Sequence, residues 1–175
     1  MSEPDPNVQR QLDALGIAYD VVACDPELAD TEAFCANYAI PPDRAANTIL
    51  VAAKTEPRQY VACLVLATTR LDVNHKLAKL IGIKRLSFAS ADETKALTGQ
   101  LIGGVTVFGL TEEMPLYVDA SVMEREWIIV GGGNRSTKLR LDPNELRKLP
   151  SARVADIASI RLPIPAVEDG KGRNA

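Results

Sequence analysis

Hydrophobic positions in the first half of the chain change between helical and strand-like spacing. Apolar residues three or four positions apart predict a helix over residues 7–15 that ends at Gly16. A second helix is expected over residues 31–39, because the prolines that follow disfavour helical backbone just before them. Apolar, β-branched runs predict strands over residues 17–22, 48–53 and 60–67. The polar turn between the last two strands indicates a hairpin.

The second half of the chain contains the same mixture with more polar connections. Residues 74–81 have helical spacing and end at a glycine. Ser90 and Glu93 stand three positions apart before another helical segment, and such a pair satisfies backbone N–H groups at a helix start. Asp142 followed by Pro143 predicts the start of a last helix, with the aspartate as its cap. Strands are expected over residues 105–109, 116–119, 127–130 and 138–141.

Helices are interspersed among these short strands without strict alternation, which argues against a doubly wound parallel sheet. We predict an α+β fold with a mixed, strongly curved, barrel-like β-sheet and surrounding helices. Residues 1–160 are expected to form a single domain. The Pro-, Gly- and charge-rich residues 161–175 are expected to be a peripheral or flexible tail.

Composition narrows the classes of function. The chain has 175 residues, 46% hydrophobic and 25% charged, which is enough for one buried core. A net charge of −3 argues against a protein that coats DNA or RNA through a general basic field, so any RNA contact is expected to be local. No apolar run approaches the ~18 residues of a membrane span and no export signal opens the chain. We therefore expect a cytoplasmic protein with no membrane partner, whose cysteines are reduced: Cys24, Cys35 and Cys63.

Two glycine clusters carry the strongest chemical signal. Gly103 and Gly104 precede a β-branched run, and Gly131 to Gly133 follow another. Glycines at such places let the backbone approach a ligand or another backbone closely. Their N–H groups could stabilise an oxyanion, or the glycines could merely bend strands. The residues after the second cluster look strand-like, which makes a dinucleotide-binding loop a poor match.

Other candidates have simple structural alternatives. Asp119 ends a strand and could orient a substrate amine, or it could cap the segment that follows. His75, the one histidine, has no serine elbow for a triad and no ligand cluster for a metal, so we expect neither metal nor cofactor. Two groups of basic residues could contact RNA locally or be solvated charges: Lys76, Lys79, Lys84 and Arg85, and Arg135, Lys138 and Arg140.

The order of these elements resembles the YbaK-type aminoacyl-tRNA deacylase domain, which also occurs inserted in bacterial prolyl-tRNA synthetases. The similarity runs over residues 12–157, and its most specific parts are residues 76–82, the Gly103-Gly104 pair, Asp119 and the second glycine cluster. It implies a small mixed, barrel-like fold. It also implies hydrolysis of a mischarged aminoacyl-tRNA, commonly one of proline identity.

The resemblance also implies a site. In the family the amino acid sits in a small pocket near the Gly-Gly loop, and a lysine at the start of a strand engages the terminal adenosine of the tRNA. This chain has Asn47 at that lysine position, Val107 where a proline is usual, and Asn134 where a basic residue is common. The predicted catalytic positions are Asn47, Gly103 and Gly104. The predicted substrate contacts are Asp119, Gly131, Gly132, Gly133, Asn134 and Lys76.

Three functions remain open at this stage. The first is a trans-acting aminoacyl-tRNA deacylase that contacts the 3′ end of its tRNA. The second is a non-catalytic relative that binds an amino acid, a nucleotide or a tRNA end, and the third is a protein-interaction module. A carboxamide lacks the charge that anchors phosphate. A cation in the pocket near Asn47, such as Lys76 or Arg70, would therefore favour the enzyme.

Overall fold

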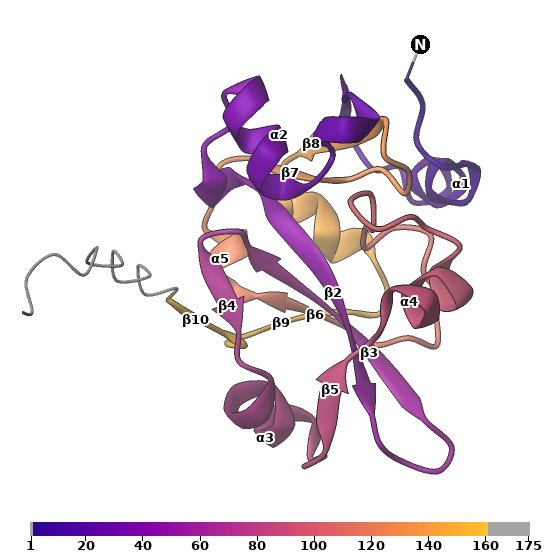
Figure 1. The fold of residues 1–175 in the computed structure, drawn as a ribbon, viewed down its shortest axis with the longest axis vertical. Coiled ribbons are helices and arrows are strands. Elements are labelled where there is room, and N and C mark those ends of the chain that lie inside the picture. The colour runs from indigo at the N-terminus through magenta and orange to yellow at the C-terminus, as the bar shows by residue number, and fades with distance from the viewer. Residues whose placement is uncertain (1, 161–175) are drawn as a thin grey trace, which may run out of the picture.

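The computed structural model describes residues 2–160, which form short strands and helices arranged in layers (Figure 1). The strands are β1 (Asp20–Ala23), β2 (Ala46–Ala53), β3 (Gln59–Leu66), β4 (Thr69–Leu71), β5 (Leu86–Phe88), β6 (Leu116–Asp119), β7 (Ile128–Gly131), β8 (Thr137–Leu141), β9 (Ala152–Ala155) and β10 (Ala158–Ile160). The α-helices are α1 (Pro6–Leu15), α2 (Thr31–Tyr38), α3 (Ala78–Ile81), α4 (Ala91–Thr98) and α5 (Ala120–Met123). The tail predicted over residues 161–175 lies outside the described residues.

A five-stranded mixed sheet forms the centre, in the order β5-β2-β3-β6-β9. The predicted hairpin is confirmed, because β2 and β3 pair antiparallel, whereas β3, β6 and β9 run parallel. Side chains alternate between the two faces of a strand, and a hydrophobic core covers each face of this sheet. Leu64 and Leu66 pack into the larger core, and Cys63 and Val65 pack into a smaller core on the opposite face.

The prediction of a barrel-like sheet is wrong, because the strands form three separate sheets. In the second sheet β8 pairs with both β1 and β7, and in the third β10 pairs with β4. A single bridge between Ala45 and Ile129 connects the three-stranded sheet to the central one. The hydrogen-bonded ladder is therefore interrupted, and none of these sheets closes on itself. The mixed α+β class itself is confirmed.

Residues 105–109, predicted as a strand, form a loop because the side chains of two glutamines bind their backbone groups. The Gln100 side chain is buried; its amide oxygen accepts from Thr106 N at 2.8 Å, and its amide nitrogen donates to Phe108 O at 2.8 Å. Gln11 in α1 accepts from Gly109 N at 2.7 Å. These side chains take the backbone groups that a neighbouring strand would have paired.

The predicted helix ends are confirmed where a cap or a glycine marked them. The Ser90 hydroxyl accepts from Glu93 N at 3.0 Å, and Asp142 caps its helix by accepting from Asn144 N at 2.8 Å. That last helix, however, is a 3₁₀ helix over Pro143–Lys148, and the helix predicted over residues 74–81 begins as a π-turn over Val73–Leu77. Short 3₁₀ turns also occur at Pro26–Leu28 and Pro42–Arg44. Across residues 2–160, none of the helices is long and apolar enough to cross a membrane.

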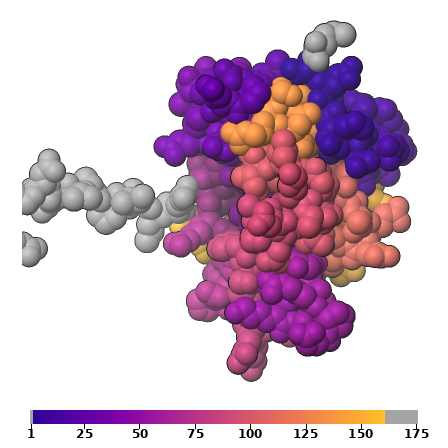
Figure 2. Space-filling view, turned by 45° about the vertical axis from the view of Figure 1, so that its right-hand side comes forward, coloured from indigo at the N-terminus to yellow at the C-terminus, as the bar shows by residue number. Residues whose placement is uncertain are grey.

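The two glycine clusters meet in space. Gly133 N donates to Gly104 O at 2.7 Å, and Asp5 N, just before α1, donates to Gly132 O at 2.8 Å. Figure 2 shows the turn between β7 and β8 held between α1 and α2, next to the long connection that leads from α4 to β6. This packing brings the Gly103 segment to the start of β2.

Candidate functional site

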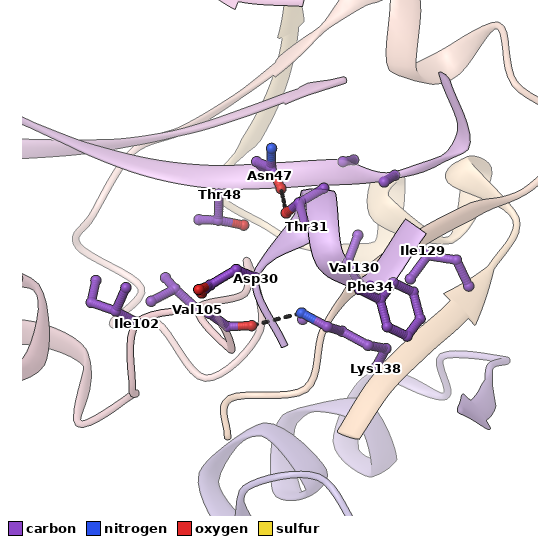
Figure 3. A pocket seen from close by; sticks show the side chains of 14 residues that line it. Asp30, Thr31, Phe34, Asn47, Thr48, Ile102, Val105, Ile129, Val130 and Lys138 are labelled. Atoms are coloured by element: carbon purple, nitrogen blue, oxygen red, sulfur yellow. Dashed lines mark hydrogen bonds between the residues drawn. The ribbon is translucent and has the colours of Figure 1, made fainter. Parts of the chain in front are cut away.

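A pocket of about 230 Å³ opens where β2 begins, between α2, the Gly103 loop and the sheet of β7 and β8 (Figure 3). One side is apolar and includes Phe34, Ile102, Val105, Ile129 and Val130. The other side is polar and consists of Asp30, Thr31, Asn47, Thr48 and Lys138. The pocket therefore combines an apolar wall with a few polar groups, as small-ligand sites usually do.

Asn47 is held by the first residue of α2. The Thr31 hydroxyl donates to the Asn47 amide oxygen at 2.6 Å (Figure 3). This bond orients the carboxamide with its oxygen toward Thr31 and its NH₂ group away from it. The amide NH₂ group of Asn47 has no acceptor among residues 2–160, so it is available as a donor to a ligand.

Thr48 adds a second uncommitted group. Its hydroxyl oxygen is buried and has no hydrogen-bond partner within the described part of the chain. Buried polar atoms without partners are rare and each needs an explanation. Thr48 also lines the pocket, so this group lies at the pocket wall.

Two cations hold the Gly103 loop from the β7–β8 side. Arg135 donates to Ile102 O at 2.7 Å and to Pro26 O at 3.0 Å. Lys138 donates to Gly103 O and to Ala29 O, both at 2.6 Å. Both side chains thus join the loop before α2 to the loop at Gly103. The Gly103 φ of 87° lies in the left-handed region, which glycine adopts without strain.

Lys138 is unusual because its charged end lies inside the protein. The residue is 6% exposed, and its ammonium lies 5.5 Å from the centroid of the Phe34 ring. Burial lowers the pKa of the Lys138 ammonium, and nearby Arg135 lowers it further, whereas Asp30 has the opposite effect. A cation does line the pocket, but it is neither of the two that the sequence suggested, Lys76 and Arg70.

The structure brings together only part of the predicted site. Asn47, Gly103 and Gly131 line the pocket. Gly104 packs against the backbone of Asn134, and a Cβ at Gly104 would collide with that carbonyl. Asn134 itself donates to Glu3 O at 2.9 Å and accepts from Ser136 N at 3.1 Å. Gly132 and Gly133 do not line the pocket either; they belong to the turn that packs against the segment before α1.

Asp119 and Lys76 lie at another corner of the molecule. One Asp119 carboxylate oxygen accepts from Ile157 N at 2.9 Å and from Ala158 N at 3.0 Å, and the other accepts from the Ser121 backbone N and hydroxyl. Lys76 donates to Asp156 at 2.9 Å and to Ala158 O at 2.6 Å. The structural alternative for Asp119, a helix cap, therefore describes its contacts.

Sequence reasoning missed Asp30, Thr31, Phe34 and Thr48 as site residues. The first three belong to the start of α2, where the sequence shows an ordinary helix beginning, and Asp30 makes no side-chain capping bond there. Thr48 follows Asn47 in an apolar strand. The signal that could have found Lys138 is its place in a strand between Thr137 and Leu139, where a charged side chain that is buried needs a partner.

Comparison with known proteins gives consistent matches. A family model described as the aminoacyl-tRNA editing domain matches residues 25–149. The protein named "Putative Cys-tRNA(Pro)/Cys-tRNA(Cys) deacylase EbsC" of Enterococcus faecalis is 28% identical over 111 residues, 63% of this chain and 65% of that protein. A proline–tRNA ligase of Burkholderia ambifaria is 28% identical over 148 residues, 84% of this chain and 25% of the ligase.

A solved structure of "a putative trans-editing enzyme for prolyl tRNA synthetase" has the same fold, with a TM-score of 0.76 and 24% identity over 89% of this chain and 98% of that one. The matches to the sequence relatives cover less than two thirds of their lengths. The family model, in contrast, covers most of this chain, including Asn47 and the Gly103 loop. The chain therefore belongs to the aminoacyl-tRNA editing domain family.

Proposed function

We propose that this protein is a trans-acting deacylase that hydrolyses the ester of a mischarged aminoacyl-tRNA. The observation that carries the proposal is the pocket at the start of β2, where the Asn47 amide NH₂ and the buried Thr48 hydroxyl lack partners within residues 2–160. Its volume of about 230 Å³ suits an aminoacyl group and lies below the ~300–1,000 Å³ of pockets for larger ligands.

The reaction needs few groups, because the ester that joins an amino acid to tRNA is already reactive. Water attacks the carbonyl carbon, and the carbonyl electron pair moves to its oxygen. The attacking water loses a proton, the carbonyl re-forms as the bond to the ribose oxygen breaks, and the ribose oxygen takes up that proton. A free amino acid and the tRNA end then leave. Positioning of the ester and donors aimed at the developing oxyanion account for most of the acceleration that such a site can give.

The residues divide these tasks. The apolar wall around Phe34 and Val105 holds the aminoacyl side chain, and Thr48 offers a hydroxyl to its polar atoms. The Gly103 N–H has no acceptor among the described residues, which leaves it available to the ester oxygen. Asn47 faces the tRNA end with a neutral donor. We place this activity in the cytoplasm, on a tRNA contacted locally at its 3′ end.

A panel of mischarged tRNAs tests the proposal. Because the relatives carry proline-related names, the panel should start with tRNA for proline charged with small amino acids, beside correctly charged tRNAs. We expect the purified protein to accelerate ester loss, beyond spontaneous hydrolysis, for at least one mischarged pair. Thr48→Val, which keeps the shape but removes the hydroxyl, should slow that reaction. If the protein cleaves none of the panel but binds a free amino acid or adenosine, the non-catalytic binding function is correct instead.

A further inference from the structure

The ammonium group of Lys138 has a donor left over. An ammonium carries three N–H bonds, and two of them bind Gly103 O and Ala29 O. No third acceptor occurs among residues 2–160. The side chain lines the pocket, so a ligand bound there would lie beside this ammonium.

Among residues 2–160, Lys138 also has no ion-pair partner. Its two partners are neutral carbonyls, and the nearest carboxylate, Asp30, is bonded to Arg135 at 3.1 Å instead. The other titratable groups that face it are the thiols of Cys24 and Cys35, and burial raises the pKa of both, so they stay neutral at physiological pH. A buried cation without an anion favours negative charge in the cavity beside it.

Holding the loops together does not explain this arrangement. Arg135 already joins the same two loops, through Pro26 O and Ile102 O, from a partly exposed position. Arg135 does not line the pocket, whereas Lys138 does. A second clamp would not need a desolvated charge at the pocket wall.

We propose that Lys138 is a catalytic residue of this pocket, whose free N–H and positive charge stabilise the oxyanion that forms on the ester carbonyl during hydrolysis. This inference rests on the proposed deacylase function. Lys138 takes no proton in the step; it binds the oxygen that gains the electron pair and releases it when the ribose oxygen leaves. Its bond to Gly103 O at 2.6 Å holds the ammonium against the Gly103 loop, which also lines the pocket.

Arg135 provides the matched control, because both residues clamp the same loops and only one lines the pocket. Lys138→Met keeps the length of the side chain and removes the charge, and Arg135→Met removes the outer clamp. With a mischarged tRNA that the parent cleaves, we expect Lys138→Met to lower kcat about 100-fold, the scale of losing one oxyanion donor. KM should change little. Arg135→Met should lower kcat only by a factor of a few.

Each outcome decides between the two roles. Equal losses of kcat in Lys138→Met and Arg135→Met would overturn the proposal and leave Lys138 as a clamp. A raised KM with unchanged kcat would also overturn it, because that pattern indicates ground-state binding. Should Lys138→Met fail to fold, Lys138→Gln retains hydrogen-bond donors without the charge and is measured in the same way. A parent that cleaves no tRNA in the panel refutes the proposed function itself, whereas a parent that cleaves while Lys138→Met is unimpaired refutes only this inference.

Discussion

Two lysines of this protein each donate to a backbone carbonyl, yet their surroundings differ. Lys76 has a side chain that is 34% exposed, and it pairs with Asp156 at 2.9 Å. The hydrogen bond and charge of Asp156 raise the pKa of the Lys76 ammonium. Lys138 is buried, has carbonyl partners only, and has its pKa lowered by burial. The resemblance to the family pointed to Lys76, and the geometry points to Lys138.

The contrast teaches how to separate structural from functional polar groups in a small fold. At the corner of Asp119 and Lys76, the Asp119 carboxylate accepts hydrogen bonds from buried backbone N–H groups and Lys76 forms an ion pair with Asp156. At the pocket, the Asn47 amide, the Thr48 hydroxyl and the Lys138 ammonium each keep a group unanswered among residues 2–160. A group left unsatisfied at a cavity wall marks a ligand site better than residue type does.

The largest effect should come from Asp119→Ala. The change leaves the N–H groups of Ile157 and Ala158 without an acceptor in a buried place. We expect a loss of about 2–5 kcal/mol in the free energy of unfolding, because each buried donor left unsatisfied costs about 1–3 kcal/mol. Urea denaturation measures it. Lys76→Met should change the same quantity far less, because exposed ion pairs contribute little to stability; a comparable loss in both variants would contradict this difference between Asp119 and Lys76.

Asn47→Lys should act on tRNA rather than on stability. A charge-assisted contact is worth about 1.5–3 kcal/mol, so binding of the tRNA should tighten about 10- to 100-fold. The gain should shrink as salt rises, because ions screen the added contact. Asn47→Met serves as a control of similar length without charge. If Asn47→Lys changes neither the Kd nor kcat/KM on any tRNA that the parent cleaves, Asn47 does not occupy the position of the family's lysine.

The two lysines should give opposite slopes of stability against alkaline pH. For Lys138 the folded pKa is lowered, so the unfolded chain binds more protons as pH approaches the ordinary lysine value of about 10.4, and stability rises with pH. For Lys76 the folded pKa is raised, so its contribution is complete below about 10.4 and is lost as pH rises further. Denaturation of the parent, Lys138→Met and Lys76→Met across this range measures both differences. Slopes of the same sign would contradict the assignment of the two environments.

Thr31→Val should have the smallest effect. It removes the donor that orients the Asn47 carboxamide but leaves the shape of α2 unchanged. One hydrogen bond is worth about 0.5–1.5 kcal/mol, so kcat/KM should fall by less than about tenfold while the urea midpoint stays close to that of the parent. Thr31→Ser keeps the hydroxyl and should behave as the parent does; an equal loss in both variants would indicate altered packing of α2.

Local signals predicted the elements that depend on local chemistry. The Ser90 cap, the stops at Gly16 and Gly82, and the β2–β3 hairpin all follow from residues within a few positions of one another. The loop over residues 105–109 could not be predicted in this way. Its backbone partners include Gln11, which is distant in sequence and whose role depends on how α1 packs.

The site, too, was predictable from the sequence only in part. Asn47 was predicted because the family resemblance places a lysine at its position, and Gly103 because a glycine pair is visible in the sequence; both line the pocket. Lys138 was visible only as one of several basic residues. Its burial depends on the arrangement of β8 against α2, and on the Ala29 carbonyl before α2, which accepts a hydrogen bond from its ammonium. Three-dimensional proximity, rather than residue type, gives Lys138 its chemistry.

The contact between the two glycine clusters has a consequence for how this sequence tolerates change. A Cβ at Gly131 would meet the Gly104 carbonyl, and a Cβ at Gly104 would meet the Asn134 carbonyl. Because the obstructing atoms belong to the main chain, no substitution at a second position can remove them. In a saturation library, both positions should therefore accept glycine alone, and suppressor screens should recover loop insertions rather than compensating side chains.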